Sequence, residues 1–190
     1  MQTSPYHLLP KVLDIIDCLQ PKRILDIGCG DGFVGLAIHR YIDQSIRLDG
    51  IDKTATKSPL LSSDYQLFTK IDFRSLEAKD LPHYDLVLLL ETLQSVNKRE
   101  GKKLLTQLLQ QNNSLLISVD RSQWDKGDFA ELSNALFLFD SERTLVFLTK
   151  DPEKIKRLRK NRITSKLLRG IGSSKTATRI IKRVTKTKSK

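Results

Sequence analysis

The sequence predicts an α/β protein: a Rossmann-like, doubly wound and mostly parallel sheet that ends in an antiparallel hairpin. Three observations predict this fold. Short β-prone runs alternate with segments of helical apolar spacing through five cycles. A glycine cluster directly follows the first strand-like run. Two further β-prone runs flank a turn at residues 141–143. In such sheets, ligands bind at the carboxyl ends of the strands, near the point where the strand order reverses.

Each element follows from its local pattern. The first helix repeats apolar residues every three to four positions, and Pro21 stops it. The run 84–90 is apolar throughout after Asp85, as expected of a central strand covered on both faces. The expected helices are 6–19, 33–42 and 98–111, and the expected strands are 23–27, 46–51, 65–71, 84–90, 114–119, 135–140 and 144–149.

Charge is distributed unevenly along the 190 residues. The formal net charge is +11. Residues 151–190 hold 15 basic and 2 acidic residues, a net of +13, which leaves −2 for the rest of the chain. We therefore expect a domain over 1–150 and a basic tail over 151–190, helical or disordered. This distribution excludes a uniformly basic protein that coats nucleic acid.

The basic tail predicts an anionic partner. In a helix, Ala177, Ile180, Ile181 and Val184 would fall within about 100° of one another and form a narrow apolar stripe. Such basic amphipathic segments bind anionic membrane surfaces, and residues 153–190 are the expected contact. Nucleic acid is the second expectation, although the tail has no aromatic residue for base stacking. A solvated tail, or one that docks on its own domain, is the third.

Other classes are excluded by composition. The cysteines, Cys18 and Cys29, form no CxxC pair, and the three histidines are scattered, so we expect free thiols and no metal site. The N-terminus does not resemble a secretory signal, and the longest apolar run has five residues. We expect a cytoplasmic protein, with a peripheral position at the inner face of the membrane if the basic tail binds there.

The glycine cluster has an acidic residue two positions before its first glycine. It reads Asp26-Ile27-Gly28-Cys29-Gly30-Asp31-Gly32. Gly30, Gly32 and Gly35 alone satisfy a dinucleotide pattern, but Asp26 would repel an anionic pyrophosphate. The full spacing instead resembles motif I of the class I S-adenosylmethionine-dependent methyltransferases, whose cofactor carries a cationic amino group and sulfonium. A plain strand–helix turn is the alternative.

The resemblance extends over roughly residues 3–120. The start Ser4-Pro5-Tyr6-His7, the segment 49–52, the strand from Tyr84 and the helix from Glu100 resemble small bacterial methyltransferases associated with cell-surface polysaccharide functions. The resemblance implies S-adenosylmethionine as cofactor, with Gly28, Cys29, Gly30 and Gly32 shaping its loop. Asp26 would then face the methionine end of the cofactor.

Three further residues complete the predicted cofactor site. Asp52 ends the second strand, 22 residues after Gly30, close to the offset of about 20 residues at which an acid binds the ribose. Asp49 is the weaker competitor, since it lies inside the strand. By resemblance, Asp72 would accept from the adenine amine and Phe73 would pack on the ring; a surface Asp with a core Phe is the alternative.

The acceptor side departs from the family pattern. By resemblance, Glu91 at the end of the fourth strand would face cofactor and substrate. The family's Glu-His pair is replaced here by Gln94-Ser95, so the expected base is missing. His7 is the candidate substitute, and packing of the first helix is its alternative role.

The sequence thus predicts a methyltransferase that acts on a glycan or a small hydroxylated acceptor. An RNA methyltransferase that grips phosphates with its tail is one alternative. A non-catalytic binding protein that kept the fold is the other.

Overall fold

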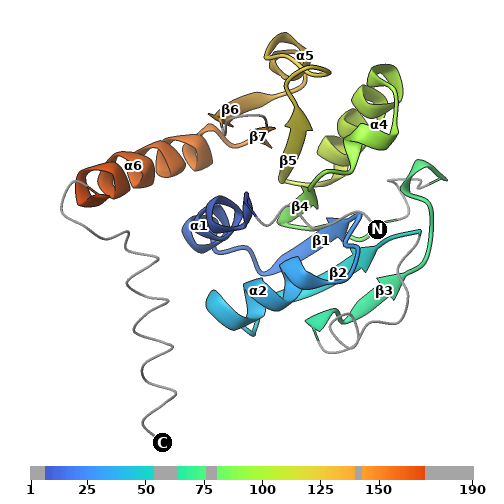
Figure 1. Ribbon diagram of the computed structural model, residues 1–190, viewed down its shortest axis with the longest axis horizontal. Coiled ribbons are helices and arrows are strands. Elements are labelled where there is room, and N and C mark those ends of the chain that lie inside the picture. Colours follow the sequence, from blue (N-terminus) through green and yellow to red (C-terminus); the bar gives the residue numbers. More distant parts are fainter. Residues whose placement is uncertain (1–6, 54–63, 76–80, 140–142, 170–190) are drawn as a thin grey trace, which may run out of the picture.

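The structure is a computed structural model that describes residues 7–53, 64–75, 81–139 and 143–169, with side chains in the last helix described through Asn161. Within these residues, seven strands form one sheet in the order β3-β2-β1-β4-β5-β7-β6 (Figure 1). The strands are β1 (Arg23–Ile27), β2 (Arg47–Ile51), β3 (Leu67–Thr69), β4 (Leu86–Leu89), β5 (Ser114–Asp120), β6 (Asn134–Phe139) and β7 (Arg143–Thr149). The helices are α1 (Leu9–Leu19), α2 (Phe33–Tyr41), α4 (Lys98–Gln111), α5 (Gly127–Ala130) and α6 (Pro152–Arg169), with 3-10 turns η1 (Phe73–Ser75) and η3 (Leu93–Ser95).

The strand order reverses at β1. This strand pairs in parallel with β2 on one side and with β4 on the other. β5 continues in parallel, whereas β7 runs antiparallel between β5 and β6. The carboxyl ends of β1, β2 and β4 therefore meet at one edge of the sheet, where this topology places its ligands.

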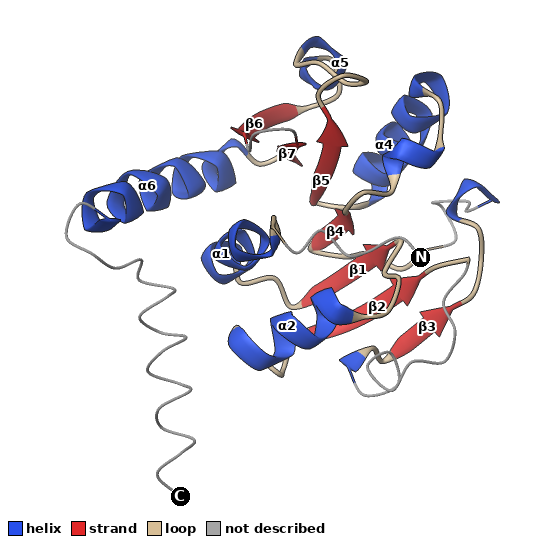
Figure 2. Ribbon diagram, in the orientation of Figure 1, coloured by secondary structure: helices blue, strands red, loops and turns tan. Residues whose placement is uncertain are grey.

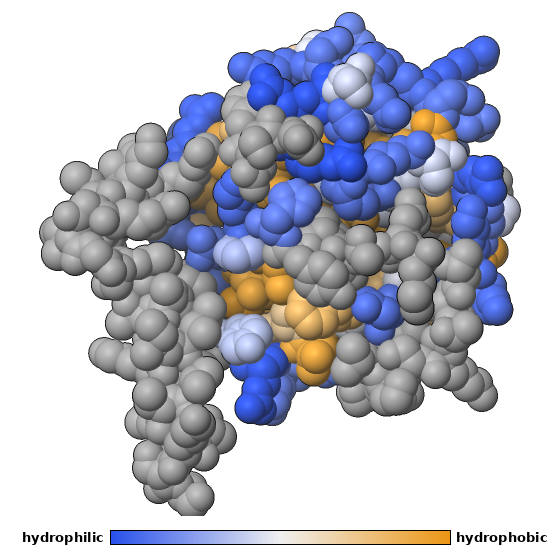
Figure 3. Space-filling model, viewed as in Figure 1, coloured by the Kyte–Doolittle hydropathy of each residue, from blue (hydrophilic) through white to orange (hydrophobic). Residues whose placement is uncertain are grey.

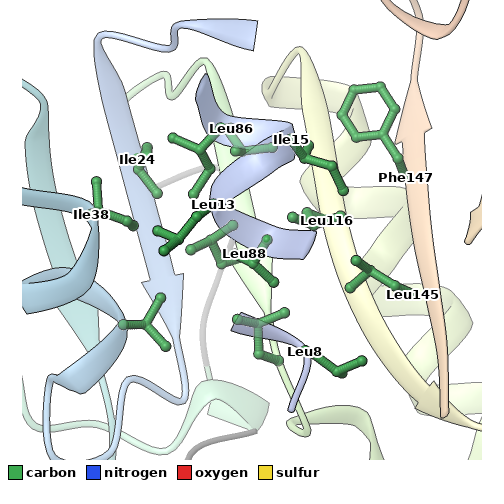
Figure 4. Close-up of a cluster of buried hydrophobic side chains, with 14 of the residues drawn as sticks. Leu8, Leu13, Ile15, Ile24, Ile38, Leu86, Leu88, Leu116, Leu145 and Phe147 are labelled. Carbon is green, nitrogen blue, oxygen red and sulfur yellow. The ribbon is translucent and has the colours of Figure 1, made fainter. Parts of the chain in front are cut away.

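Helices cover both faces of the sheet (Figure 2). Helices α1, α2 and α6 pack on one face, where Leu13, Leu86 and Phe147 belong to one buried cluster (Figure 4). Helix α4 and the segment around α5 cover the other face, where Leu105 and Trp124 belong to a second cluster. Hydrophilic side chains dominate the outer surface over α4 and α5 (Figure 3). Because the two clusters pack on opposite faces of the sheet, they fix the position of the strand ends from which the glycine loop starts.

The predicted fold class is confirmed, and most element bounds lie within a few residues of the expectation. The helix expected at 98–111 is α4, which starts after Asn97, whose side chain caps the Glu100 N–H. The third strand is shorter than expected, and Tyr65, expected as its first residue, lies outside it and is buried among hydrophobic side chains. Over the described residues, no helix is long and apolar enough to cross a membrane.

Helix α6 begins where the basic tail was expected to begin. Its first turns bury Ile155 and Leu158 in the cluster that α1 also lines. The helix then extends away from the sheet (Figure 1). The packed part of the chain therefore continues past residue 150. The apolar stripe expected at residues 177–184 lies outside the described residues.

Candidate cofactor and acceptor site

The glycine loop follows β1 at the carboxyl edge of the sheet. Gly28 has a φ of +81°, and a β-carbon there would lie 2.6 Å from Thr92 Oγ1. Gly30 has a φ of +56°, and a β-carbon there would meet no atom of the described residues within 4 Å. Gly28 is thus required for packing against the segment after β4, whereas the surface over Gly30 is open. There a ligand can approach the backbone next to the N-terminus of α2.

Asp26 is a buried carboxylate next to this loop. Its side chain is on β1, the residue is 2% exposed, and Tyr65 Oη donates a 2.6 Å hydrogen bond to its Oδ2. Burial raises the pKa of Asp26 to about 6, with a further contribution from the charge of Asp52, although the Tyr65 hydrogen bond lowers it. Among the described residues, no Lys or Arg forms an ion pair with this carboxylate.

Asp52 lies against the loop from the neighbouring strand. Its Oδ2 accepts a 3.0 Å hydrogen bond from the Gly30 N–H. Asp49, the competing acid, is buried inside β2 and lies 3.2 Å from Arg23 Nη2 and 3.6 Å from Arg47 Nε. The structure therefore joins Asp52, not Asp49, to the glycine loop.

The segment after β3 carries Asp72 and Phe73. Arg74 donates to both carboxylate oxygens of Asp72, and these hydrogen bonds lower the pKa of Asp72. Phe73 is buried in the second core cluster with Ile51. Phe73 thus packs the core, as the alternative interpretation expected.

Cys29 contributes its backbone to the loop. Its carbonyl accepts a 3.0 Å hydrogen bond from the Gly32 N–H. The side chain is 3% exposed, and burial raises the pKa of the thiol. At neutral pH the thiol is protonated, and it serves as a small apolar group.

Glu91 belongs to a polar cluster at the ends of β4 and β5. Its backbone adopts a left-handed conformation with φ of +60°. Ser118 Oγ accepts from the Glu91 N–H at 2.7 Å and donates to Glu91 Oε1 at 2.9 Å. Arg143 Nη2 lies 3.2 Å from Glu91 Oε2, and Arg143 Nη1 lies 2.8 Å from Asp120 Oδ2. Left-handed backbone at a non-glycine residue costs energy and persists only when its surroundings hold it, as these contacts do here. We call these four residues the Glu91 cluster.

Gln94 and Ser95 are engaged locally. Gln94 Nε2 donates to Glu91 Oε2, and Ser95 Oγ donates to the Thr92 carbonyl at 3.0 Å. His7 is exposed, in the turn before α1. Its neighbour Leu8 is buried in the core cluster on the α1 face of the sheet (Figure 4).

The structure therefore brings the predicted residues into two groups. Asp26, Gly28, Gly30 and Asp52 form one, around the glycine loop. Glu91 lies in the other, and Thr92 joins the groups because its Oγ1 donates to the Ile27 carbonyl at 2.7 Å while it packs on Gly28.

Sequence reasoning missed Tyr65, Ser118 and Arg143. Tyr65 was expected as a strand residue; the available signal was the presence of two glycines, Gly35 and Gly50, that leave room for its ring. Arg143 was expected in the hairpin turn, and only the antiparallel insertion of β7 brings it to Glu91. No group of three metal-ligating side chains occurs within the described residues.

Comparisons with known proteins identify the fold. No protein-family model matches the sequence, and no curated protein matches it. Among solved structures, the bifunctional kinase-methyltransferase WbdD has a TM-score of 0.64 at 17% identity, over 76% of this chain and 39% of WbdD. Magnesium protoporphyrin IX methyltransferase ChlM from Synechocystis, solved with bound S-adenosylmethionine, has a TM-score of 0.58 at 14% identity, over 76% of this chain and 79% of ChlM. The S-adenosylmethionine-dependent methyltransferase SibL has a TM-score of 0.58 at 14% identity, over 76% and 55%.

The chain thus has the fold of the class I S-adenosylmethionine-dependent methyltransferases, as the sequence predicted. It spans about two fifths of the length of WbdD. At these identities the likeness establishes the fold, and the activity has to be argued from the residues of this chain.

Proposed function

We propose that this chain binds S-adenosylmethionine and transfers its methyl group. The state of Asp26 carries the proposal. A buried carboxylate without a counter-ion is costly, and a cationic ligand at the adjacent open loop would supply the missing charge. The amino group and the sulfonium of S-adenosylmethionine are such cations, whereas a dinucleotide would bring further negative charge. ChlM, with the same fold, was solved with this cofactor bound.

The other cofactor contacts follow from position. The carboxylate of Asp52, at the end of β2, would accept hydrogen bonds from the ribose hydroxyls. The backbone around Gly30 would lie against the cofactor, with Cys29 contributing main-chain atoms only. Asp72 would exchange one of its Arg74 contacts for the adenine amine. When bound, the cofactor supplies an activated methyl group, and the protein orients it against the acceptor.

Calorimetry with S-adenosylmethionine and its demethylated product tests cofactor binding. We expect both to bind the unmodified chain, and Asp26→Asn to weaken binding by roughly 100-fold, about 2.7 kcal/mol. Asp31→Asn is the matched control, because it removes one exposed charge from the same loop, where Asp31 Oδ1 accepts from the Phe33 N–H at 3.1 Å. If neither ligand binds the unmodified chain, the proposed function is wrong.

We propose a hydroxylated acceptor, either a glycan or a small molecule, bound at the Glu91 cluster. The cluster offers carboxylate acceptors and a guanidinium donor side by side, which adjacent hydroxyl groups can use together. It adjoins the cofactor loop through Thr92. A hydroxyl nucleophile benefits from a base, and His7 is our candidate for that role.

Turnover with a panel of hydroxylated acceptors tests this assignment. Glu91→Gln should lower kcat/KM by roughly tenfold or more, since it removes one charged hydrogen-bond acceptor, and leave cofactor affinity unchanged. His7→Ala should lower kcat and alter its pH profile. Cofactor binding with no turnover on any acceptor, RNA included, would instead indicate a non-catalytic protein that kept the fold.

We propose that the basic segment 151–190 attaches the protein to the anionic inner face of the cytoplasmic membrane. Its support is charge: 15 basic residues, each worth about 1 kcal/mol where it lies near an anionic surface. Burial of Ile155 and Leu158 anchors the start of this segment to the sheet. A truncation that tests it must therefore end after Asn161, so that both buried residues remain.

Vesicle flotation distinguishes the possible partners. The full chain should float with phosphatidylglycerol vesicles and not with phosphatidylcholine vesicles, and the truncated chain should lose this binding while it retains cofactor affinity. Binding to RNA in preference to anionic vesicles would favour the RNA methyltransferase alternative instead.

A further inference from the structure

Tyr65 was not predicted as a site residue, yet it lies between two elements of the cofactor site. Its ring is buried between β2 and α2. A β-carbon at Gly35 would lie 2.4 Å from Tyr65 Cε2, and one at Gly50 would lie 2.8 Å from Tyr65 Cδ1. Only glycine leaves room for the ring at both positions. Gly35, which completes the apparent dinucleotide pattern, is thus explained by this packing.

The hydroxyl of Tyr65 links the cofactor helix to Asp26. Gly35 is the third residue of α2, and its N–H is one of the first-turn donors that have no partner within the helix. This N–H donates to Tyr65 Oη at 3.2 Å, and Tyr65 Oη donates to Asp26 Oδ2 at 2.6 Å. Through these two hydrogen bonds, the partial positive charge at the N-terminus of α2 stabilises the negative charge of the carboxylate.

We infer that Tyr65 is a positioning residue for the cofactor: its hydroxyl holds the Asp26 carboxylate ionised and oriented for the cationic end of the ligand. The inference rests on the proposed function and extends it to a residue that acts through Asp26. Of the groups that affect the pKa of Asp26, only Tyr65 stabilises the negative charge. Loss of this hydrogen bond would therefore favour the protonated form of the carboxyl group.

The groups around Asp26 make this role necessary. Burial raises the pKa of Asp26, and the charge of Asp52 also disfavours a second negative charge there. Burial raises the pKa of the Cys29 thiol as well, so this neighbour is neutral near pH 7. Burial and the Asp26 charge raise the pKa of Tyr65, so its hydroxyl remains a donor. Of these groups, only Tyr65 favours the ionised form of Asp26.

The variant Tyr65→Phe keeps the ring and removes the hydroxyl. Because a hydrogen bond that lowers the pKa of Asp26 is lost, cofactor affinity should fall by roughly tenfold at pH 6 and by about threefold or less at pH 7.5. Calorimetry with S-adenosylmethionine at both pH values measures this. Tyr84→Phe is the matched control, since Tyr84 Oη donates to a different buried carboxylate, Asp49, at 3.0 Å. It should leave the affinity unchanged at both pH values.

The outcomes separate the inference from the proposed function. An equal loss of affinity at both pH values, or no loss, would overturn the positioning role. If the unmodified chain binds no cofactor, the proposed function fails instead. The hydrogen bond between Tyr65 and Asp26 can then still be tested by unfolding the ligand-free protein. Tyr65→Phe should lower the free energy of unfolding more at pH 7.5 than at pH 4, where Asp26 is protonated. A pH-independent loss of stability would show that the hydroxyl does not stabilise the Asp26 charge.

Discussion

Within the described residues, two buried tyrosines each donate a hydrogen bond to a buried aspartate, and the environments of these two pairs differ. Tyr65 donates to Asp26 at 2.6 Å, and Tyr84 donates to Asp49 at 3.0 Å. Both aspartates are 2% exposed. Asp49 also lies near two guanidinium groups, one of which is stacked 4.9 Å from the centre of the Tyr84 ring. Asp26 has no such cation among the described residues.

This difference distinguishes Asp49, whose charge contributes to the fold, from Asp26, to which we assign a role in cofactor binding. Asp26 and Asp49 lie on neighbouring strands, one residue out of register, so their side chains point to opposite faces of the sheet. The charge of Asp49 is balanced within the protein. On the proposed function, a cationic ligand balances the charge of Asp26, which lies next to the open glycine loop.

The largest expected effect comes from exchanging the two carboxylates for amides. Asp26→Asn should reduce cofactor affinity by roughly 100-fold without lowering the free energy of unfolding, because the amide needs no counter-ion. Asp49→Asn should lower the free energy of unfolding by about 2 kcal/mol, since it leaves two arginines without their partner, and should not change affinity. Calorimetry and denaturant unfolding measure both quantities. If Asp26→Asn instead lowered the free energy of unfolding and Asp49→Asn instead lowered cofactor affinity, the comparison would be wrong.

The pH dependence of stability gives the next effect. The pKa of Asp26 is about 6 in the folded protein against 3.8 when exposed, so the folded state holds this proton more tightly. The stability that results is complete below pH 3.8 and is lost as the pH rises through 6, about 3 kcal/mol in all.

Urea unfolding of the unmodified chain and of Asp26→Asn between pH 4 and 7 measures this loss, which only the unmodified chain should show. Added S-adenosylmethionine should recover part of it at pH 7. Parallel pH profiles of the two proteins would contradict the assignment.

A smaller effect is expected from filling the space around Tyr65. Gly35→Ala places a β-carbon against the ring, and overpacking of this kind costs about 1–3 kcal/mol of stability. Because the ring must shift away from Asp26, cofactor affinity should fall as well. Gly127→Ala is the control, because Gly127 is the exposed first residue of α5 and its β-carbon would meet, among the described residues, only Asp125 Oδ1 at 3.1 Å. Unchanged affinity in Gly35→Ala would show that the position of Tyr65 is unimportant.

The smallest effect concerns an acid on the surface. Asp72 and Arg74 form an exposed ion pair, which water and salt screen. Arg74→Ala should leave the thermal midpoint unchanged within error, and should slightly strengthen cofactor binding if it frees Asp72 for the adenine amine. A clear drop in the midpoint would mean that this ion pair stabilises the fold, as the buried pairs of Asp49 do.

Local patterns predicted most of the elements and part of the site. The helix at 98–111 and the alternation of strands follow from periodicity and capping, which act over a few residues. Asp26, Gly30 and Asp52 were identified because they lie at strand ends, and strand ends converge in a parallel sheet. Tyr65 and Arg143 were not, because each meets its partner across about 39 to 52 positions of chain, and only tertiary packing sets such contacts.

The sequence by itself determined the α/β alternation, the glycine loop with its preceding acid, and the concentration of basic charge in residues 151–190. These depend on residue types and local spacing alone. Only the tertiary structure decided which acid faces the loop and which is neutralised, since burial and counter-ions arise when distant segments pack. It also decided that α6 belongs to the core through Ile155 and Leu158. Charge counts along the chain could not separate these cases, because the energy of a charge depends on its surroundings and not on its place in the sequence.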